Sequence, residues 1–454
     1  MKFSTLLIFL FFTQLVSSQK LAKAYESFKQ DPQLKYAISS LYVIDAKTGA
    51  VVFDENSRIG LAPASTQKVV TAVATLETLG TKPVFVTTVK IRGRQVIIEP
   101  SGDPSFGSWR YAASSKEKII RDIADQMELK GLNIISDTVL FTNGLAGKKE
   151  IPSGWINEDV GNYYGAAANG FIWNENQYDL VFIPGKKAGD DTGIDTAASG
   201  RIWPFIINEC KTGPAGSGDN AYIYYIPGEN KLLVKGTVPA GEKRFKISGS
   251  DYSPELSFLA DLQKEQIKRG FAAAAASNGN IEIEYKYMSP GLDSMIYWFL
   301  QKSVNLYGEA FIKALALVNR DKGQDLGDSL SSISTEDGVD AVLSFWKQKG
   351  IDVNELNISD GSGLSPQNRV TTHAQVEILK YAKGRDWFPV FYAALPTYNN
   401  MKMKSGTIRD VKGFCGYHVS KDGHEYIFSF LVNNFNGTSS GVVGKMFRVL
   451  DQLK

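Results

Sequence analysis

Ser65 and Lys68 lie three residues apart in LAPASTQKVV, at the start of a stretch with the spacing of an amphipathic helix. Residues three apart share one face of a helix, so the lysine amine can reach the serine hydroxyl. If burial or a second cation lowers the pKa of this lysine, its neutral amine can take the serine proton and create a nucleophile. The same spacing occurs at Ser17–Lys20 and Ser115–Lys118. Alone, the pair therefore favours a helix-terminus serine beside a solvated lysine.

Two further motifs follow this pair along the chain and change that interpretation. The segment QKSVNLYGEAF supplies an S-x-N element, Ser303 and Asn305, at the end of a helix expected to begin near Pro290. The segment MKMKSGTIRDVKGFCGY supplies a K-[ST]-G element that leads into a predicted hairpin. S-x-x-K, S-x-N and K-[ST]-G, in this order, form a recognised set for acyl transfer to a serine nucleophile. The residues of the third element are Lys404, Ser405, Gly406 and Thr407.

The K-[ST]-G tripeptide has two other copies, at Lys47–Gly49 and Lys211–Gly213. The first precedes Ser65 at a predicted hairpin turn, and the second lies in the glycine-rich segment CKTGPAGSGDN. Of the three lysines, Lys404 alone follows the S-x-N element and opens a predicted strand. We therefore interpret both other copies as turns.

The order of predicted elements indicates an α+β chain with a large insertion. A hairpin around AKTG precedes a predicted helix over residues 63–79. From about residue 84 the sequence is rich in predicted strands, with helices near 116–130 and 254–270, and helices return near residue 290. A mostly β region of this length is too long for a loop. The predicted organisation is a signal peptide at 1–18, one domain in two parts at 19–90 and 286–454, and an inserted, mostly β region at 91–285.

The N-terminal segment MKFSTLLIFLFFTQLVSSQK combines one lysine, an apolar run and small residues before Gln19. This order is typical of a secretory signal peptide cleaved after Ser18, and the apolar run is too short for a confident transmembrane helix. We therefore expect an exported, periplasmic protein without a stable membrane anchor, the alternative being an uncleaved N-terminal anchor. A formal net charge of +2 gives no reason to expect binding to nucleic acid or to a membrane through a polybasic surface.

Cysteine and histidine are too scarce to indicate a disulfide framework or a metal centre. Cys210 and Cys415 allow one bridge or two buried thiols, and both possibilities stay open. The histidines, His373, His418 and His424, form no metal-binding motif, and we interpret them as structural. No metal ion or organic cofactor is expected.

Taken together, the motifs make the sequence similar to the class C, low-molecular-weight penicillin-binding proteins, the D-alanyl-D-alanine carboxypeptidases and endopeptidases of the peptidase S13 type. PASTQK matches the nucleophile motif, KSVNLYGE the S-x-N segment, and KSGTIRDVKGFCGY the K-[ST]-G-T strand and turn. SGDPSF, ANGFIWNENQYDL and DGSGLSPQNRVT also resemble family segments, and the long separation of Lys68 from Ser303 agrees with the family's insertion. Val304 and Ser405 stand where Asp and Thr are frequent.

The resemblance implies an α+β fold of the serine β-lactamase and transpeptidase type. In that fold a five-stranded antiparallel sheet is covered by helices, with Ser65 at the start of a buried helix and Lys404 on an edge strand. It also implies that the substrates are peptidoglycan stem peptides and that β-lactams are inhibitors. A serine in the first turn of a helix has backbone N–H groups and the positive end of the helix dipole beside it, which stabilises developing negative charge.

The expected reaction begins when Ser65 attacks the carbonyl of the penultimate D-Ala while Lys68 takes its proton. By resemblance, the N–H groups of Ser65 and Thr407 hold the oxyanion. Ser303 is expected to relay the proton to the leaving D-Ala, and Asn305 to orient the substrate and the lysine. Water then releases the acyl group.

The K-[ST]-G element is expected to bind the substrate's terminal carboxylate. Lys404 would add positive potential that keeps Lys68 neutral, and the hydroxyls of Ser405 and Thr407 would receive the carboxylate. Gly406 completes the element.

Two alternatives compete with this assignment. A serine β-lactamase shares all three motifs, but it gives no reason for the long insertion, and the E-x-x-L-N element of class A enzymes is absent because Val353 stands where its glutamate would fall. A catalytically silent peptidoglycan-binding protein of the same fold is the second alternative, although every motif side chain is present.

Overall fold

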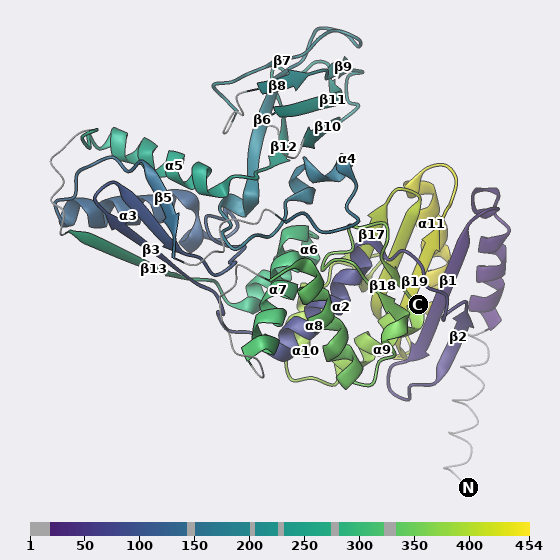
Figure 1. Cartoon of the computed structure of the whole chain (residues 1–454). Helices are drawn as coiled ribbons and strands as arrows, with labels where there is room; N and C mark the ends of the chain where they lie inside the picture. The colour runs from purple at the N-terminus through teal and green to yellow at the C-terminus, as the bar shows by residue number, and fades with distance from the viewer. Residues whose placement is uncertain (1–18, 143–149, 200–204, 226–230, 274–280, 322–332) are drawn as a thin grey trace. The chain divides into compact units, whose positions relative to one another are not determined.

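The chain folds into two compact units, each assembled from separate stretches of sequence (Figure 1). The predicted signal peptide at residues 1–18 lies outside the residues that the computed structural model describes, which are 19–142, 150–199, 205–225, 231–273, 281–321 and 333–454. The first unit contains Met1–Thr81, Ile296–Val304 and Glu336–Lys454, and the second contains Lys82–Met295 and Asn305–Thr335.

The bounds of the second unit differ from those of the insertion predicted at residues 91–285. The unit begins at Lys82, its first stretch ends at Met295, and it also includes Asn305–Thr335. Strands β3 (Val86–Arg92) and β13 (Glu282–Met288) pair along their whole length, so a boundary at residue 90 would divide one strand of this pair.

A six-stranded antiparallel sheet forms the centre of the first unit, in the order β16-β17-β18-β19-β1-β2. Five of these strands form the sheet expected from the resemblance, and the two-residue β16 adds a sixth. Because β16 pairs only with Met401 and Lys402, the rest of β17 stays at the edge of the sheet. The strands are β1 (Ile38–Asp45), β2 (Val51–Glu55), β16 (Thr397–Tyr398), β17 (Met401–Ile408), β18 (Val411–Val419) and β19 (Glu425–Asn433).

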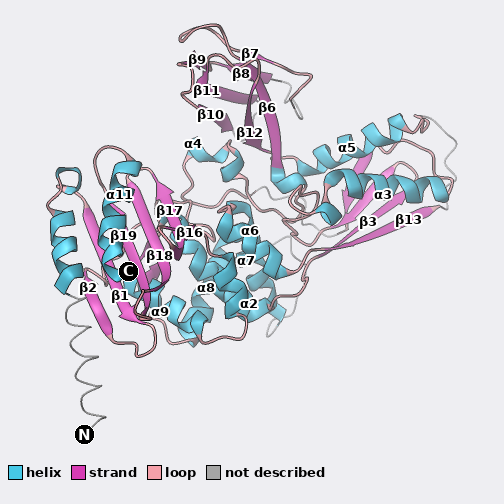
Figure 2. Cartoon of the chain, turned by 180° about the vertical axis from the view of Figure 1, so that it is seen from behind, coloured by secondary structure: helices cyan, strands magenta, loops and turns pink. Residues whose placement is uncertain are grey.

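Both faces of this sheet are buried. On one face, Leu41 and Phe430 pack with Leu21 and Met446. Leu21 belongs to the helix over residues 19–29 and Met446 to α11 (Ser439–Leu450), which Figure 2 shows beside the sheet. On the other face, Ser429 donates a hydrogen bond from Oγ to Oε1 of Gln375 in α9 (Thr372–Lys383), at 2.6 Å. The interior strands therefore read as nearly continuous apolar runs, and helices cover each side.

The remaining elements of the first unit surround the sheet. They are η1 (Pro32–Leu34), η2 (Ala64–Gln67), α2 (Lys68–Leu79), most of α6 (Leu292–Gln301), α8 (Thr335–Gln348), η8 (Val353–Glu355), α9 (Thr372–Lys383), α10 (Phe388–Ala394), α11 (Ser439–Leu450), η9 (Asp451–Leu453), and the strand pair β14 (Leu356–Asn357) and β15 (Arg369–Val370).

The described residues of the second unit form three sheets. In the first, ordered β13-β3-β4-β5, buried side chains such as Val89 and Ile98 pack against Ile123 of α3 and Phe258 of α5. The other two sheets have the orders β12-β6-β7 and β10-β11-β8, with β9 also pairing β11. The elements not yet bounded are β4 (Gln95–Glu99), η3 (Ala112–Ser114), α3 (Lys116–Leu129), β5 (Thr138–Phe141), α4 (Asn157–Val160), η5 (Tyr163–Gly165), η6 (Asn174–Asn176), β6 (Gln177–Ile183), β7 (Gly193–Ile194), β8 (Phe205–Asn208), β9 (Lys211–Gly213), β10 (Asn220–Tyr225), β11 (Lys231–Pro239), β12 (Phe245–Ser250), α5 (Pro254–Lys268) and α7 (Asn305–Asp321).

The predicted helices near 63–79, 116–130 and 254–270 are confirmed as η2 with α2, as α3 and as α5. The first K-[ST]-G copy lies in the turn between β1 and β2, as predicted, where Asp45 Oδ1 accepts hydrogen bonds from backbone N–H groups. The turn predicted for the second copy was wrong. Lys211–Gly213 forms β9, because these residues pair in parallel with Thr237–Pro239 of β11.

Cys210 and Cys415 are both buried free thiols, which settles the choice left open by the sequence. Burial raises the pKa of Cys210 to about 11 and that of Cys415 to about 12. Across the described parts of the chain, no helix has the length and apolar character that a membrane span requires.

Candidate active site

Leu61 and Ala62, the two residues before Pro63, are hydrogen-bonded to two other segments of the chain. Leu61 exchanges two backbone hydrogen bonds with Val370, at 3.0 and 2.9 Å. The next residue, Ala62, donates from its N–H group to Oδ1 of Asn433 at 2.8 Å and accepts from Nδ2 of the same side chain at 3.1 Å. These four bonds fix where the turn that contains Ser65 begins.

Ser65 lies in the single 3₁₀ turn η2, directly before α2. Ala64, the residue before it, is buried and has a φ of +46°, a conformation that costs free energy for any residue with a Cβ atom. Gly363 packs against this strained peptide so closely that a Cβ atom there would lie 2.0 Å from Ala64 O. The surrounding chain therefore imposes the conformation that presents Ser65.

Lys68 is fully buried and begins α2. Its Nζ atom lies 3.0 Å from Ser65 Oγ and 2.8 Å from the carbonyl oxygen of Ser362. The aromatic ring of Phe299 in α6 lies 5.7 Å from the same nitrogen. The two residues of the S-x-x-K motif are thus in direct contact, and the amine lies in a small polar niche inside an apolar setting.

A buried aspartate organises the loop that supplies this niche. Asp360 Oδ1 accepts from the N–H group of Gly363 at 2.7 Å, and its Oδ2 accepts from Ser365 N at 2.7 Å. The side-chain amide of Gln67 donates to the Asp360 carbonyl oxygen at 2.5 Å, which ties the loop to the turn of Ser65. The sequence DGSGLSPQNRVT of this loop resembles a family segment, but the motifs predict no role for it at the site.

Glycine in the K-[ST]-G element permits a close approach of β17 to the Ser65 turn. A Cβ atom on Gly406 would lie 2.4 Å from Pro63 O and 3.0 Å from Ser65 N. Across the hairpin, a Cβ atom on Gly413 would lie 3.1 Å from the methyl group of Thr66. Larger residues at either position would push the strand away from the serine.

Lys404 lies on the same strand face as Gly406 and is almost fully buried. Its Nζ atom donates to the Ser405 carbonyl oxygen at 2.8 Å, and Cys415 lies directly opposite it in β18. The pKa of Lys404 is lowered to about 7, chiefly by burial; Cys415 opposes the shift and Lys412 contributes to it. The site therefore holds a second buried amine besides that of Lys68.

Ser405 and Thr407 point to the opposite face of β17, because side chains alternate along a strand. Thr407 pairs directly with Lys412 of β18, and the Lys412 Nζ atom donates to Thr407 Oγ1 at 2.6 Å. Burial lowers the pKa of Lys412. Two hydroxyl groups and one amine therefore share this face. Lys412 is a site residue that the sequence motifs do not predict.

The S-x-N element falls at the boundary between the two units. Ser303 lies in the loop after α6 with a φ of +57°, and it belongs to the first unit. Asn305 begins α7 in the second unit, where its side-chain amide donates to the Tyr164 carbonyl oxygen at 2.8 Å. The roles expected for Ser303 and Asn305 beside the serine stay predictions.

Glu355, a buried carboxylate two residues after Val353, is committed to other partners. Glu355 forms an ion pair with Arg58 and accepts a hydrogen bond from Thr371 Oγ1. His373 Nδ1 lies 3.0 Å from Glu355 Oε2, so this histidine belongs to the same cluster. Among the described residues, no group of three His, Cys, Asp or Glu side chains is placed to hold a metal ion.

Comparison with known proteins agrees with this geometry. A model of the D-Ala-D-Ala carboxypeptidase 3 (S13) family matches residues 21–449. A D-alanyl-D-alanine carboxypeptidase from Actinomadura sp. is 24% identical over 92% of this chain and 82% of its own length. The D-alanyl-D-alanine carboxypeptidase DacB of Haemophilus influenzae is 20% identical over 85% of this chain and 83% of its own.

The fold also has a counterpart among solved structures. The crystal structure of penicillin binding protein 4 (dacB) from Haemophilus influenzae superposes with a TM-score of 0.74 at 18% identity, covering 94% of this chain and 98% of that one. The transpeptidase-type fold expected from the motifs is therefore confirmed. Because the family model spans nearly the whole sequence, the chain belongs to the D-Ala-D-Ala carboxypeptidase 3 (S13) family.

Proposed function

We propose that this chain is a serine-type D-Ala-D-Ala carboxypeptidase and endopeptidase that cleaves peptidoglycan stem peptides through an acyl-enzyme on Ser65. The observation that carries the proposal is the contact between Lys68 Nζ and Ser65 Oγ, at 3.0 Å, in which the lysine is fully buried. Burial disfavours a charged amine, and a neutral amine at this position can accept the serine proton.

In the first half of the reaction, Ser65 Oγ bonds to the carbonyl carbon of the penultimate D-Ala, and Lys68 takes the hydroxyl proton. The bond to the terminal D-Ala then breaks, its nitrogen receives a proton, and D-Ala leaves. In the second half, water adds to the ester and restores the serine. The expected proton relay to the leaving group is Ser303, with Asn305 orienting the substrate.

The backbone N–H groups of Ser65 and Thr407 are the proposed oxyanion donors. The close packing of Gly406 against Ser65 N supports this pairing, because it brings the backbone of β17 beside the serine. Each donor of this kind contributes on the order of 3 kcal/mol to stabilising the transition state.

The terminal carboxylate of the substrate is proposed to meet the face of β17 that carries Ser405 and Thr407. Lys412 supports this placement, since its amine already donates to the Thr407 hydroxyl. A cation beside two hydroxyl donors matches a carboxylate better than the hydroxyls do alone. Lys404, on the other face of the strand, would contribute positive potential around Lys68.

The proposed location is the periplasm, after export directed by the N-terminal segment. Stem peptides are there, and the family membership supports peptidoglycan as substrate and β-lactams as ligands. Removal of residues 1–18 on export is checked by N-terminal sequencing of the secreted protein, which is expected to begin at Gln19.

Labelled penicillin tests the nucleophile. Incubation followed by digestion and mass spectrometry is expected to give one covalent adduct, on the peptide that contains Ser65. An adduct on another peptide, or no adduct with folded protein, would refute both the nucleophile and the proposed activity. A protein that is acylated once but never cleaves a D-Ala-D-Ala peptide would instead be the silent binding protein.

A β-lactamase differs from a peptidase in how fast it hydrolyses the penicilloyl ester. That step needs a base that activates water, and Glu355 is already engaged with Arg58, Thr371 and His373. We therefore expect penicillin release over minutes or longer beside repeated turnover of a D-Ala-D-Ala peptide. Sustained rapid ring opening, without a burst of one equivalent, would favour the β-lactamase.

A further inference from the structure

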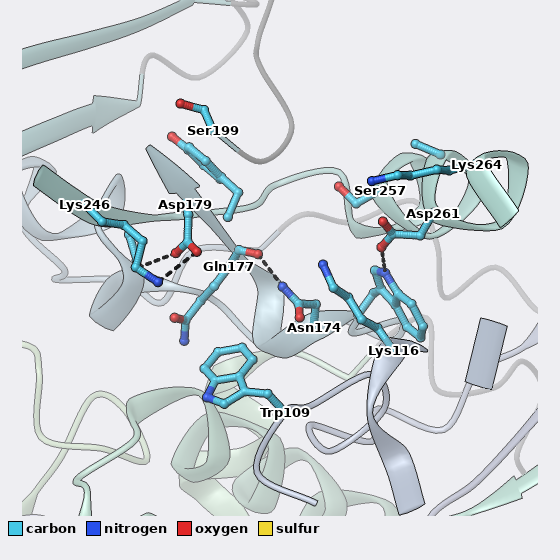
Figure 3. Close-up of a pocket in the computed structure, with 14 residues that line it drawn as sticks. Trp109, Lys116, Asn174, Gln177, Asp179, Ser199, Lys246, Ser257, Asp261 and Lys264 are labelled. Atoms are coloured by element: carbon cyan, nitrogen blue, oxygen red, sulfur yellow. Dashed lines mark hydrogen bonds and ion pairs between the residues drawn. The ribbon is translucent and has the colours of Figure 1, made fainter. Parts of the chain in front are cut away.

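A cavity of about 650 Å³ lies among residues of the second unit, and none of the three catalytic motifs lines it. Its volume is within the range of ligand-binding sites. Figure 3 shows Lys116, Asp261 and Lys264 on one side and Asp179 and Lys246 on the other. The lining residues that carry the argument are Trp109, Lys116, Asn174, Gln177, Asp261 and Lys264.

Trp109 gives this cavity an aromatic surface. Its side chain is large, yet the residue is 51% exposed, and Figure 3 places the indole below Gln177 and Asn174. An indole face is apolar while its surroundings here are polar. A pyranose ring matches both properties, because it presents a face of C–H groups bordered by hydroxyl groups.

The polar walls of the cavity are held in place by the protein itself. Asp179 accepts hydrogen bonds from Ser248 Oγ at 2.9 Å and from Lys246 Nζ at 3.0 Å. Asp261 Oδ2 accepts from the indole N–H group of Trp173 at 2.9 Å. These groups are already oriented, so a ligand would meet a rigid polar surface.

One lining residue, Asn174, belongs to a strained turn. Asn174, Glu175 and Asn176 have φ values of +52°, +53° and +49°, three consecutive residues in a region that residues with a Cβ atom rarely adopt. Asn176 Nδ2 donates to Ala167 O at 2.9 Å, and Tyr307 OH donates to Glu175 Oε1 at 3.0 Å, which holds the turn. Strain of this kind clusters at binding sites.

Within the described residues, the cavity also contains lysine amines without a partner, and a second hollow adjoins it. In the described parts of the chain, the amines of Lys116 and Lys264 and the amide of Gln177 have no hydrogen-bond or ion-pair partner. A second hollow of about 370 Å³ continues between α3 and α5 and shares Lys116, Asp261 and Lys264 with the first. Two adjoining hollows suit an elongated ligand with negative charge.

We propose that this cavity binds the glycan strand of peptidoglycan, with an N-acylated amino-sugar ring stacked on Trp109 and a carboxylate of the strand facing Lys116 and Lys264. The choice of polymer rests on the proposed function. The site would hold the strand while its stem peptides are cleaved, and would raise turnover of polymeric substrate without changing turnover of a free D-Ala-D-Ala peptide.

The test uses the full chain with Ser65 already acylated by penicillin, so that the active site is blocked. A tetrasaccharide of alternating N-acetylglucosamine and N-acetylmuramic acid, without stem peptides, is titrated by calorimetry. Trp109→Ala is expected to weaken binding at least tenfold, and Trp109→Phe less. The double variant Lys116→Ala/Lys264→Ala is expected to weaken it about fivefold and to remove its salt dependence, whereas a neutral N-acetylglucosamine tetramer should bind both forms alike.

Two variants of the same unit serve as controls. Tyr222→Ala removes an exposed aromatic side chain of β10 and Lys130→Ala an exposed lysine after α3, and neither residue lines the cavity, so neither should change the affinity. No binding of the tetrasaccharide at millimolar concentration, an unchanged affinity in Trp109→Ala, or equally tight binding of polyglutamate would overturn the proposal. Penicillin acylation distinguishes failure of the glycan site from failure of the proposed function. If the wild type is acylated but the glycan does not bind, the glycan site alone is refuted, whereas failure of acylation refutes the proposed function.

Discussion

Within the described residues, the S-x-x-K elements Ser65–Lys68 and Ser115–Lys118 both lie at helix starts, and the sequence alone does not separate them. At the start of α3, Ser115 Oγ accepts a hydrogen bond from the Lys118 backbone N–H group at 3.4 Å, and the Lys118 amine turns outward to Asp122. At the start of α2, the Lys68 amine itself lies 3.0 Å from Ser65 Oγ. The first pair caps a helix, and the second brings a base to a hydroxyl group.

The difference arises from the conformation before the serine and from what surrounds the lysine. Ser115 has an extended backbone, typical of a helix cap, and Lys118 is partly exposed. Ser65 instead lies inside a 3₁₀ turn after the strained Ala64, and Lys68 is fully buried. Spacing along a helix therefore does not identify a nucleophile. A nucleophile is indicated where the lysine amine is buried and the serine hydroxyl does not cap the helix.

The largest effect expected from this comparison is on acylation. Ser65→Ala should abolish both penicillin labelling and D-Ala release, because no other hydroxyl group takes the place of the nucleophile. Ser115→Ala should leave both rates within about twofold of the wild type, since it changes a helix cap. Stopped-flow acylation and D-Ala release assays measure the two rates. A large loss in Ser115→Ala would remove the distinction between the two pairs.

The copies of K-[ST]-G allow the same kind of comparison, and the expected effect on the acylation rate is the second largest. Lys404→Ala should slow acylation about a hundredfold or more, because it removes the buried amine beside the serine turn, whose protonated form supplies positive charge there. Lys211→Ala should leave the rate nearly unchanged, since Lys211 is exposed and pairs with Asp191 on the surface of the second unit. Equal losses in the two variants, measured as second-order acylation constants, would contradict the assignment of Lys404.

Sequence motifs identified the serine, the lysine and the strand, since these depend on residue type and order. The loop around Asp360 escaped assignment because its contribution is made by backbone groups, including the Ser362 carbonyl oxygen, which any residue could supply. The position of Lys412 can be predicted from the sequence. A two-residue turn after Ile408 pairs Thr407 with Lys412, so a prediction of this turn also predicts that Lys412 lies opposite Thr407.

The insertion shows where sequence patterns lose information. Its strands follow from local patterns, whereas its bounds at residues 91 and 285 stay a prediction, because the pairing of β3 with β13 joins segments far apart in the chain. The glycine-rich surroundings of Lys211–Gly213 likewise predict a turn, and only the parallel pairing with β11 reveals the strand β9. Local patterns predict elements, whereas long-range partners decide their limits.

A smaller effect concerns pH and the same two lysines. The pKa of Lys404 is about 7 in the folded chain, below its ordinary value of 10.5. Between pH 7 and 10 the unfolded chain binds the proton and the folded chain does not, so this group makes the folded state more stable as pH rises, by at most about 1.4 kcal/mol per pH unit. The difference in unfolding free energy between the wild type and Lys404→Met should therefore rise with pH in urea titrations.

Lys211→Met is the matched control for this experiment. Asp191 raises the pKa of Lys211, so both its folded and unfolded forms hold the proton between pH 7 and 10. Its difference from the wild type should stay flat over that interval. A flat difference for Lys404→Met as well would mean that Lys404 keeps its proton in the folded chain.

The smallest expected effect reverses the ranking of the two serines. Ser115→Ala should lower the free energy of unfolding by about 1 kcal/mol, the usual cost of removing a helix cap. Ser65→Ala should cost less than about 0.5 kcal/mol, because Lys68 keeps the Ser362 carbonyl oxygen as an acceptor and no backbone N–H group loses a side-chain partner. Ser115→Asp restores a capping oxygen and should recover most of the loss. Urea unfolding of the three variants decides the matter. If Ser65→Ala proved the more destabilising change, Ser65 would be holding the turn together, and the contrast between a capping serine and a catalytic one would fail.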